Sequence, residues 1–308
     1  MKRKMKYHCA LLISATLLAP QVANSQRAIA FEGIENGRDM GGIVVEDGRT
    51  VCSGMLIRSG DLSKATDVDL RVLRERYRLT CVFDFRMEAE AEAAPDRVID
   101  GASYSHLSTL PRALVEGLAS QGDGSAQMKK SDMMAMLLKY AFDPKMQAMG
   151  RQLYPAIVCD SAAQHYYGRF LRGVLRAEGG VLWHCSQGKD RAGWASAFVL
   201  AALGASRSVI VEDFDLSNQS YARQVEAMTA KVREDAEARK HGGAEEGDSL
   251  EQEAVAFVQA MVGVSRENFE ATLDLIDQRY GSLPQYIENQ LGFSKEEQRQ
   301  LRAKYLKN

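Results

Sequence analysis

The sequence of 308 residues lacks long apolar runs, apart from a short one near its N-terminus at residues 9–19. Four basic residues precede this run: Lys2, Arg3, Lys4 and Lys6. The small residues of a signal-peptidase site follow at 23–25. Because the run is well short of the roughly 20 residues that span a bilayer, we expect residues 1–25 to be a cleaved signal peptide rather than a retained anchor. The protein should then be exported, periplasmic or secreted, and without stable membrane insertion.

A basic tract is also lacking. The chain has 39 basic and 41 acidic residues, and removal of residues 1–25 leaves 35 against 41. This balance gives no reason to expect nucleic-acid binding. Histidines are few, and those beyond residue 25 are scattered: His106, His165, His184 and His241. No two of them stand at ligand spacing with a cysteine, so we expect no metal site.

Cysteine is scarce as well. Four cysteines remain after residue 25: Cys52, Cys81, Cys159 and Cys185. In an oxidising compartment such cysteines can pair. A chain of this length does not need disulfides to fold, but one bridge among Cys52, Cys81 and Cys159 is compatible with the sequence, which does not select the pair.

Strands and helices alternate through the middle of the chain, and helices dominate its C-terminal part. Short β-rich apolar segments predict strands at 79–85, 103–107 and 181–184. Caps and apolar spacing predict helices at 67–77, 111–119, 131–141, 161–176, 191–204, 208–221 and 265–280, and from 295 onward. This order is typical of an α/β fold with a central, mainly parallel sheet flanked by helices.

Two segments are harder to interpret. Residues 108–160 are rich in methionine, which gives soft and adaptable packing. They form either a peripheral helical insertion or a lid over the active site. Residues 231–249 are charged and contain glycine, which predicts a poorly ordered surface segment.

The segment 184–191, with the sequence HCSQGKDR, carries the chemistry. It lies between an expected strand and an expected helix, where backbone N–H groups and the helix dipole can bind a phosphate. Gly188 lets the backbone turn sharply there. The residues expected to bind the phosphate are Ser186, Gln187, Gly188, Lys189, Ala192 and Gly193.

Cys185 and Arg191 are the expected catalytic pair. A helix N-terminus and nearby cations can lower the pKa of a cysteine from about 8.5 to between roughly 3.5 and 7.5, which provides a nucleophilic thiolate. The planar guanidinium of Arg191 can hold two phosphate oxygens at once. A lone cysteine is more often a buried core residue, but Cys-x5-Arg after a strand, with Gly188 and Lys189 between them, is far more specific.

These residues resemble the active-site signature of cysteine-dependent protein tyrosine phosphatases. The Gly-Lys-Asp-Arg form is similar to that of the atypical bacterial members that also accept phosphoinositides. The likeness extends to residues 36–42, 58–59, 84–86 with Glu88 or Glu90, 215–220 and 280–286. It implies a tyrosine-phosphatase-like domain over 26–308, a phosphocysteine intermediate and no metal or cofactor. The implied substrate is a phosphorylated protein or a small-molecule or lipid phosphate.

The sequence departs from the family pattern at two places. Ala192 stands where the family often has a hydroxyl that helps the thiolate leave, so the second step should be slow. The stretch 108–112 contains no acid, whereas many relatives carry a general acid there, and Asp190 becomes the better candidate. Asp84 could contact the loop or fix Arg86.

Three further residues complete the expected support for the site. His184 directly precedes the nucleophile. Arg38 and Asp39 are expected to form an internal ion pair that supports the loop, in preference to binding substrate.

Two other functions stay open besides a protein phosphatase. Lys189 beside Arg191 suits a substrate with more than one phosphate, such as a phosphoinositide or inositol phosphate. Ala192 would fit a phosphate-binding pseudophosphatase, although Cys185, Asp190 and Arg191 are intact. A rhodanese-like sulfur carrier is a more distant alternative, because the Gly-Lys-Asp-Arg segment has no evident use there.

Overall fold

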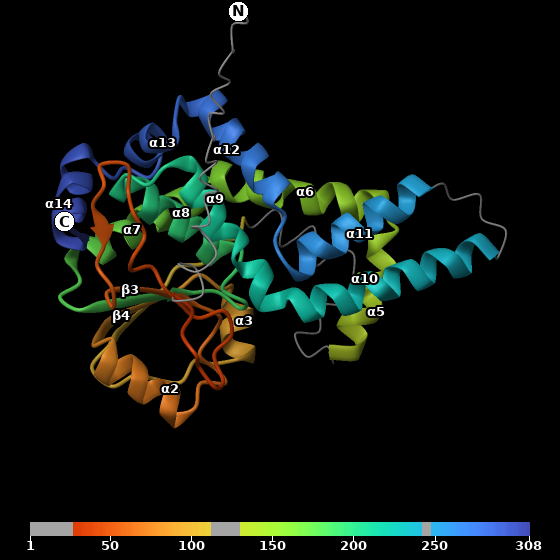
Figure 1. Ribbon diagram of the computed structural model, residues 1–308, viewed down its shortest axis with the longest axis horizontal. Coiled ribbons are helices and arrows are strands. Elements are labelled where there is room, and N and C mark those ends of the chain that lie inside the picture. The colour runs from red at the N-terminus through yellow and green to blue at the C-terminus, as the bar shows by residue number, and fades with distance from the viewer. Residues whose placement is uncertain (1–26, 112–129, 242–247) are drawn as a thin grey trace, which may run out of the picture.

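A five-stranded sheet forms the centre of the protein (Figure 1). The computed structural model describes residues 27–111, 130–241 and 248–308. The strands follow the order β1-β3-β6-β4-β5. Their bounds are β1 (Arg38–Asp39), β3 (Leu56–Ser59), β6 (Gly180–His184), β4 (Leu79–Asp84) and β5 (Ser103–His106). All neighbours are parallel except β1 and β3, which confirms the expected α/β class with a mainly parallel sheet.

Helices cover both faces of the sheet because its strands are apolar on both sides. Along β6, Val181 and Trp183 face the larger core, while Leu182 faces the smaller one. Helices α7 (Ser161–Arg176) and α8 (Arg191–Leu203) pack on the first face. Helix α2 (Asp67–Arg71), continued by the short π-helical turn η1 (Val72–Arg76), packs on the second.

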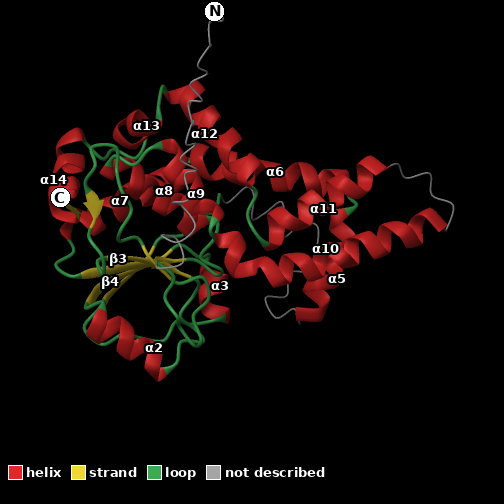
Figure 2. Cartoon of the chain, in the orientation of Figure 1, coloured by secondary structure: helices red, strands yellow, loops and turns green. Residues whose placement is uncertain are grey.

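The remaining elements are mostly helical (Figure 2). They are α3 (Glu88–Ala93), α5 (Lys130–Ala141), α6 (Pro144–Cys159), α9 (Arg207–Asp215), α10 (Ser217–His241), α11 (Asp248–Val262), α12 (Arg266–Tyr280), α13 (Leu283–Asn289) and α14 (Lys295–Tyr305). Strands β2 (Thr50–Val51) and β7 (Leu306–Lys307) form a separate antiparallel pair.

Local capping explains why several helices begin and end where the sequence predicts. Thr66 accepts a hydrogen bond from Asp69 N, and Ser265 accepts one from Asn268 N. Ser294 and Glu297 form the expected capping box of α14. Gly204 ends α8 with φ of +93°, a backbone conformation that favours glycine.

Two predictions for the segment after residue 207 are wrong. The helix expected over 208–221 is two helices, because α9 ends at Asp215 and α10 starts at Ser217. The surface segment expected over 231–249 is largely helical, since α10 continues to His241 and α11 starts at Asp248. Met228, Val232 and Ala236 repeat every four residues and are buried, a stripe that the surrounding charges hide in the sequence.

Helices α5, α6, α10 and α11 form an arm beside the sheet domain, with a small core of its own (Figure 1). The helix expected over 131–141 is confirmed by α5, whereas the one expected over 111–119 lies, apart from its first residue, outside the described residues. Helix α6 was not expected, and Pro155 inside it interrupts the helical pattern of the sequence. Packing within the arm overrides that local signal.

The cysteines and the helix lengths bear on two earlier expectations. Cys52, Cys81, Cys159 and Cys185 are all free, so the bridge that the sequence allowed is not formed. Cys52 follows β2, Cys81 lies in β4 and Cys159 ends α6. Within the described ranges, none of the helices has the length and apolar character needed to cross a bilayer.

Candidate active site

The loop 185–190 connects β6 to α8 at the carboxyl edge of the parallel strands. Gly188 has φ of +67°, as the sharp turn expected there requires. A Cβ at Gly188 would lie 2.2 Å from the carbonyl oxygen of Ser59, so a side chain would also be excluded by contact. Glycine at this position therefore brings the loop against the end of β3.

Side chains from distant segments hold the loop carbonyls on its outer side. Asn36 Nδ2 donates to the carbonyls of Gln187 and Gly188 at 3.2 and 3.1 Å. Tyr221 OH donates to the Gln187 carbonyl at 2.7 Å. Arg58 Nη2 donates to the Gly188 carbonyl at 2.7 Å. Peptide N–H groups point away from their carbonyls, so with these two carbonyls held on the outer side the inner side of the loop can bind an anion.

Arg58 is itself held by a buried carboxylate. Its Nη1 donates to Asp213 Oδ2 at 3.0 Å, and Asp213 also accepts from Arg27 Nη1 at 3.0 Å. Arg38 Nη2 lies 3.9 Å from Asp213 Oδ2. Three guanidinium groups thus surround one carboxylate on α9, and the surplus of positive charge lies directly behind the loop.

Burial and charge act in opposite directions within this cluster. Burial raises the pKa of the Asp213 carboxyl, but the charges of Arg38, Arg58 and Arg27 hold it below its usual value. Burial, together with the neighbouring Arg58, lowers the pKa of Arg38 to about 9. Asp213 therefore stays ionised and is the main counter-charge of the cluster.

Cys185 lies in a cavity of about 520 Å³ and is itself buried, with 2% of its surface exposed. Loop residues in the cavity wall are Cys185, Ser186, Gln187, Asp190 and Arg191. Leu137 of α5 and Met261 and Val262 of α11 form another part of the wall. The expected nucleophile and the expected phosphate-binding arginine therefore share one cavity with the candidate general acid.

Glu90 on α3 orients Arg191. Its two oxygens accept from Arg191 Nη1 at 2.6 Å and Nη2 at 2.9 Å, and Oε1 also accepts from Ser186 Oγ at 2.6 Å. Burial raises the pKa of Glu90, but the hydrogen bonds and the charge of Arg191 have the larger effect and lower this pKa to about 2. The guanidinium is fixed in one plane. Its Nη1 also donates to the Phe85 carbonyl at 3.4 Å and its Nη2 to Ser186 Oγ at 3.3 Å, so within the described residues Nε–H is the group left for an anion.

Asp190 is held by two donors, one on each oxygen. Tyr154 OH donates to Oδ1 at 2.8 Å, and Lys189 Nζ lies 2.8 Å from Oδ2. Burial, and then the charge of Asp190, raise the pKa of Tyr154 well above its usual value, so its hydroxyl keeps the proton that it donates. Lys189 is buried and does not line the cavity.

Ala192 and Gly193 form the first turn of α8. Both are buried, and the Ala192 carbonyl accepts from Trp183 Nε1 at 3.2 Å. A Cβ at Gly193 would lie 2.6 Å from the ring of Phe214. A side chain at position 193 would therefore prevent α8 from packing against α9 as closely as it does.

Asp84 belongs to a buried polar cluster beneath the site. It accepts hydrogen bonds from Arg86 Nη2 at 2.7 Å and from Arg86 N at 2.9 Å. Asp84 therefore fixes Arg86, which is one of the two roles that the sequence suggested for it. His184 Nδ1 lies 3.8 Å from Asp84, and His184 Nε2 lies 3.0 Å from Asp96. Asp84, Asp96 and His184 have the donor types of a metal site. Arg86 Nη2 already lies 2.9 Å from Asp96 and supplies the positive charge between the two carboxylates.

The ion pair expected between Arg38 and Asp39 is wrong. Neighbouring residues of a strand point to opposite faces. Arg38 Nη1 donates to Asn36 Oδ1 at 2.6 Å and so supports the loop indirectly. Asp39 accepts from the amides of Gly41 and Gly54 at 2.8 and 2.7 Å and orders the turns of the N-terminal segment.

Comparison with known proteins agrees with this geometry. The profile of the tyrosine phosphatase family matches residues 29–307. The chain belongs to the tyrosine phosphatase family. A protein of Cupriavidus necator named as a tyrosine-protein phosphatase is 29% identical over 292 residues, which is 94% of this chain and 92% of that protein. The triple specificity protein phosphatase PtpB of Mycobacterium tuberculosis is 30% identical over 278 residues, 83% of this chain and 91% of that protein. The chain is therefore an enzyme of the protein-tyrosine-phosphatase class, with a phosphorylated substrate.

Sequence reasoning missed three residues that shape the site. Asp213 interrupts the apolar face of α9 between Ile210 and Phe214, and a charge in such a face signals a buried ion pair. Glu90 was noted only as part of a motif. Tyr154 carried no signal, because α6 was not recognised.

We predict that Asp213→Asn strongly destabilises the fold. The substitution leaves buried guanidinium groups without their carboxylate, which costs about 3–5 kcal/mol when one partner of a buried pair is removed. Urea unfolding measures the loss. Glu212→Gln, at an exposed position of the same helix, is the control and should stay within about 0.5 kcal/mol of the parent. A similarly small change for Asp213→Asn would contradict the clamping role of this carboxylate.

The low pKa of Glu90 predicts a specific pH dependence. A carboxylate whose pKa falls from 4.5 when unfolded to about 2 when folded stabilises the protein above pH 4.5. That stabilisation is lost as the pH falls toward 2. The difference in melting temperature between the parent and Glu90→Gln should therefore be largest near neutral pH. It should shrink as the pH falls from 4.5 to 2. Glu88→Gln, exposed on the same helix, should show no such convergence. A gap that persists unchanged at pH 2 would refute the pairing.

Proposed function

We propose that this phosphatase hydrolyses phosphate monoesters through a phosphocysteine intermediate on Cys185. The observation that carries the proposal is the shared cavity, which Cys185 and Arg191 both line, at a loop whose Gln187 and Gly188 carbonyls are held on its outer side. Such a site binds a dianion and places a thiolate against its phosphorus.

The reaction has two steps. The Cys185 thiolate attacks phosphorus, the S–P bond forms and the ester P–O bond breaks, while Asp190 gives a proton to the leaving oxygen. Arg191 and the loop amides stabilise the charge on the three equatorial oxygens. Water then attacks the phosphocysteine, Asp190 accepts its proton, the S–P bond breaks, and phosphate and the thiolate are released.

Ala192 affects the second step. Its methyl side chain supplies no hydroxyl to the departing sulfur, and the residue is completely buried. We therefore propose that hydrolysis of the intermediate limits turnover. Cys185, Asp190 and Arg191 are intact and share one cavity, which disfavours a pseudophosphatase.

The substrate class that we favour is a phosphorylated protein, as in the tyrosine-phosphatase class. The name of the mycobacterial relative indicates a broader specificity for that protein. A phosphoinositide substrate would need a cation for a second phosphate. Lys189 is buried against Asp190 and does not line the cavity, so Lys64, which does line it, is the lysine that could take this role. Initial rates on a phosphotyrosine peptide and a water-soluble phosphoinositide separate the two classes.

Two further proposals concern the location and the access of the enzyme. Residues 1–25, which lie outside the described residues, have the pattern of a signal peptide and support export. Leu137, within the segment 108–160, lines the cavity and supports a covering role for that segment.

We predict that Cys185→Ser lowers phosphatase activity by at least about 1,000-fold, because the nucleophile is lost. Binding of vanadate, a phosphate analogue, should persist, since the anion site consists of amides and Arg191. Hydrolysis of p-nitrophenyl phosphate and isothermal titration with vanadate provide the two measurements. Cys52→Ser, outside the cavity, should retain the parent activity. Near-normal turnover by Cys185→Ser would rule out the covalent mechanism.

The role of Asp190 can be tested through the leaving group. Phenol needs a proton in order to leave, whereas p-nitrophenolate leaves without one. Asp190→Asn should therefore lower kcat/KM on phenyl phosphate by about 100-fold or more, and lower kcat/KM on p-nitrophenyl phosphate much less, because kcat/KM reports the step in which the ester bond breaks. Glu212→Gln, exposed on α9, serves as the control. An equal loss of kcat/KM on both substrates would mean that Asp190 positions the loop and does not donate the proton.

A further inference from the structure

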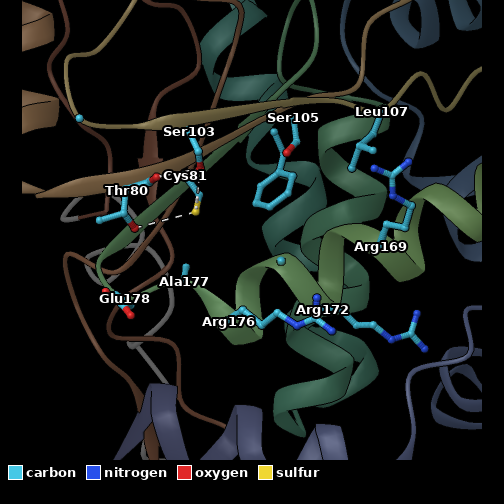
Figure 3. A pocket seen from close by; sticks show the side chains of 13 residues that line it. Thr80, Cys81, Ser103, Ser105, Leu107, Arg169, Arg172, Arg176, Ala177 and Glu178 are labelled. Atoms are coloured by element: carbon cyan, nitrogen blue, oxygen red, sulfur yellow. Dashed lines mark hydrogen bonds between the residues drawn. The ribbon is translucent and has the colours of Figure 1, made fainter.

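A second cleft, of about 670 Å³, lies between the edge of the sheet and helix α7 (Figure 3). Ser103 and Ser105 of β5 and Thr80 and Cys81 of β4 line one side, and α7 lines the other. None of its lining residues belongs to the cavity around Cys185. The phosphatase reaction makes no use of this cleft.

The helix side of the cleft is basic. Arg169, Arg172 and Arg176 lie three and seven residues apart and so share one side of α7, as Figure 3 shows. Arg172 donates to Glu297 of α14 at 3.0 Å. Arg169 and Arg176 are exposed and have no ion pair within the described residues, and Glu178 is the one acid in the lining. This excess of positive charge stands out in a chain whose net charge is −2.

The strand side of the cleft is a free edge. β5 is the last strand of the sheet, and nothing in the described ranges pairs with its outer side. Ser103 is exposed and Ser105 is half-buried, and both line the cleft, where the Ser103 hydroxyl donates to the Thr80 carbonyl at 3.0 Å. The outward N–H and C=O groups of an edge strand can bind one more extended segment.

We propose that this cleft docks an extended acidic segment of a protein, which adds to the outer edge of β5 and places its carboxylates against Arg169 and Arg176. The two arginine Cα atoms are separated by about 10.5 Å along the helix. Acidic residues at positions i and i+4 of a strand are about 13 Å apart, so two long arginine side chains can reach both. A small polyanion would leave the strand edge unused. Docking does not depend on the chemistry at Cys185.

The test uses the full chain and two synthetic ten-residue peptides labelled with fluorescein. One alternates glutamate with threonine, and the other carries glutamine in place of glutamate. Fluorescence anisotropy should show that the glutamate peptide binds the parent protein. The glutamine peptide should bind the parent at least about tenfold more weakly. The R169Q/R176Q variant should bind the glutamate peptide more weakly than the parent does, by a similar factor. The control R71Q/R74Q removes two charges from α2 and η1, on the other face of the sheet, and should bind like the parent.

Two additional arms separate this proposal from its rivals. Two glutamate peptides, one N-methylated at its glutamates and the other at its threonines, each lack the N–H donors along one edge of the strand, and one of the two should lose binding. Equal binding of both, or equal weakening by both double variants, would overturn the proposal. Arg-dependent binding of inositol hexakisphosphate without binding of the glutamate peptide would likewise overturn it in favour of a small polyanion. Matching melting temperatures establish that the variants are folded, and the binding result stands whether or not the chain hydrolyses phosphate esters.

Discussion

The buried guanidinium of Arg58 links the sheet to the phosphate loop. It extends from the end of β3. It donates one hydrogen bond to the Gly188 carbonyl and another to the Asp213 carboxylate. A peptide plane has a donor on one edge and an acceptor on the other, so fixing the carbonyl fixes the direction of the amide. The anion site that we propose on the inner side of the loop depends on that orientation, and Cys185 and Arg191 line the same cavity.

The residues that could be predicted from the sequence are those whose evidence is local. Cys185, Gly188 and Arg191 lie within seven consecutive positions. The pattern of apolar residues predicted the strand before them and the helix after them. The mainly parallel sheet followed from the alternation of these elements.

The residues that were missed act over long distances in the chain. Asp213 lies 155 residues from Arg58, and Tyr154 lies 36 residues from Asp190. Only the fold brings such partners together. The error over 231–249 had a different origin, because a charged surface concealed the buried positions Val232 and Ala236. The pairing of Arg38 with Asp39 failed since adjacency in a strand separates side chains.

The imbalance of three arginines around Asp213 links folding to ligand occupancy. An anion bound in the loop would offset part of the mutual repulsion of these cations. The unfolded chain has no equivalent site, so such an anion would favour the folded state. Ligand present at 100 times its dissociation constant stabilises a fold by about 2.7 kcal/mol. On the proposed mechanism, inorganic phosphate, the product of the reaction, would therefore also stabilise the native state as a bound ligand.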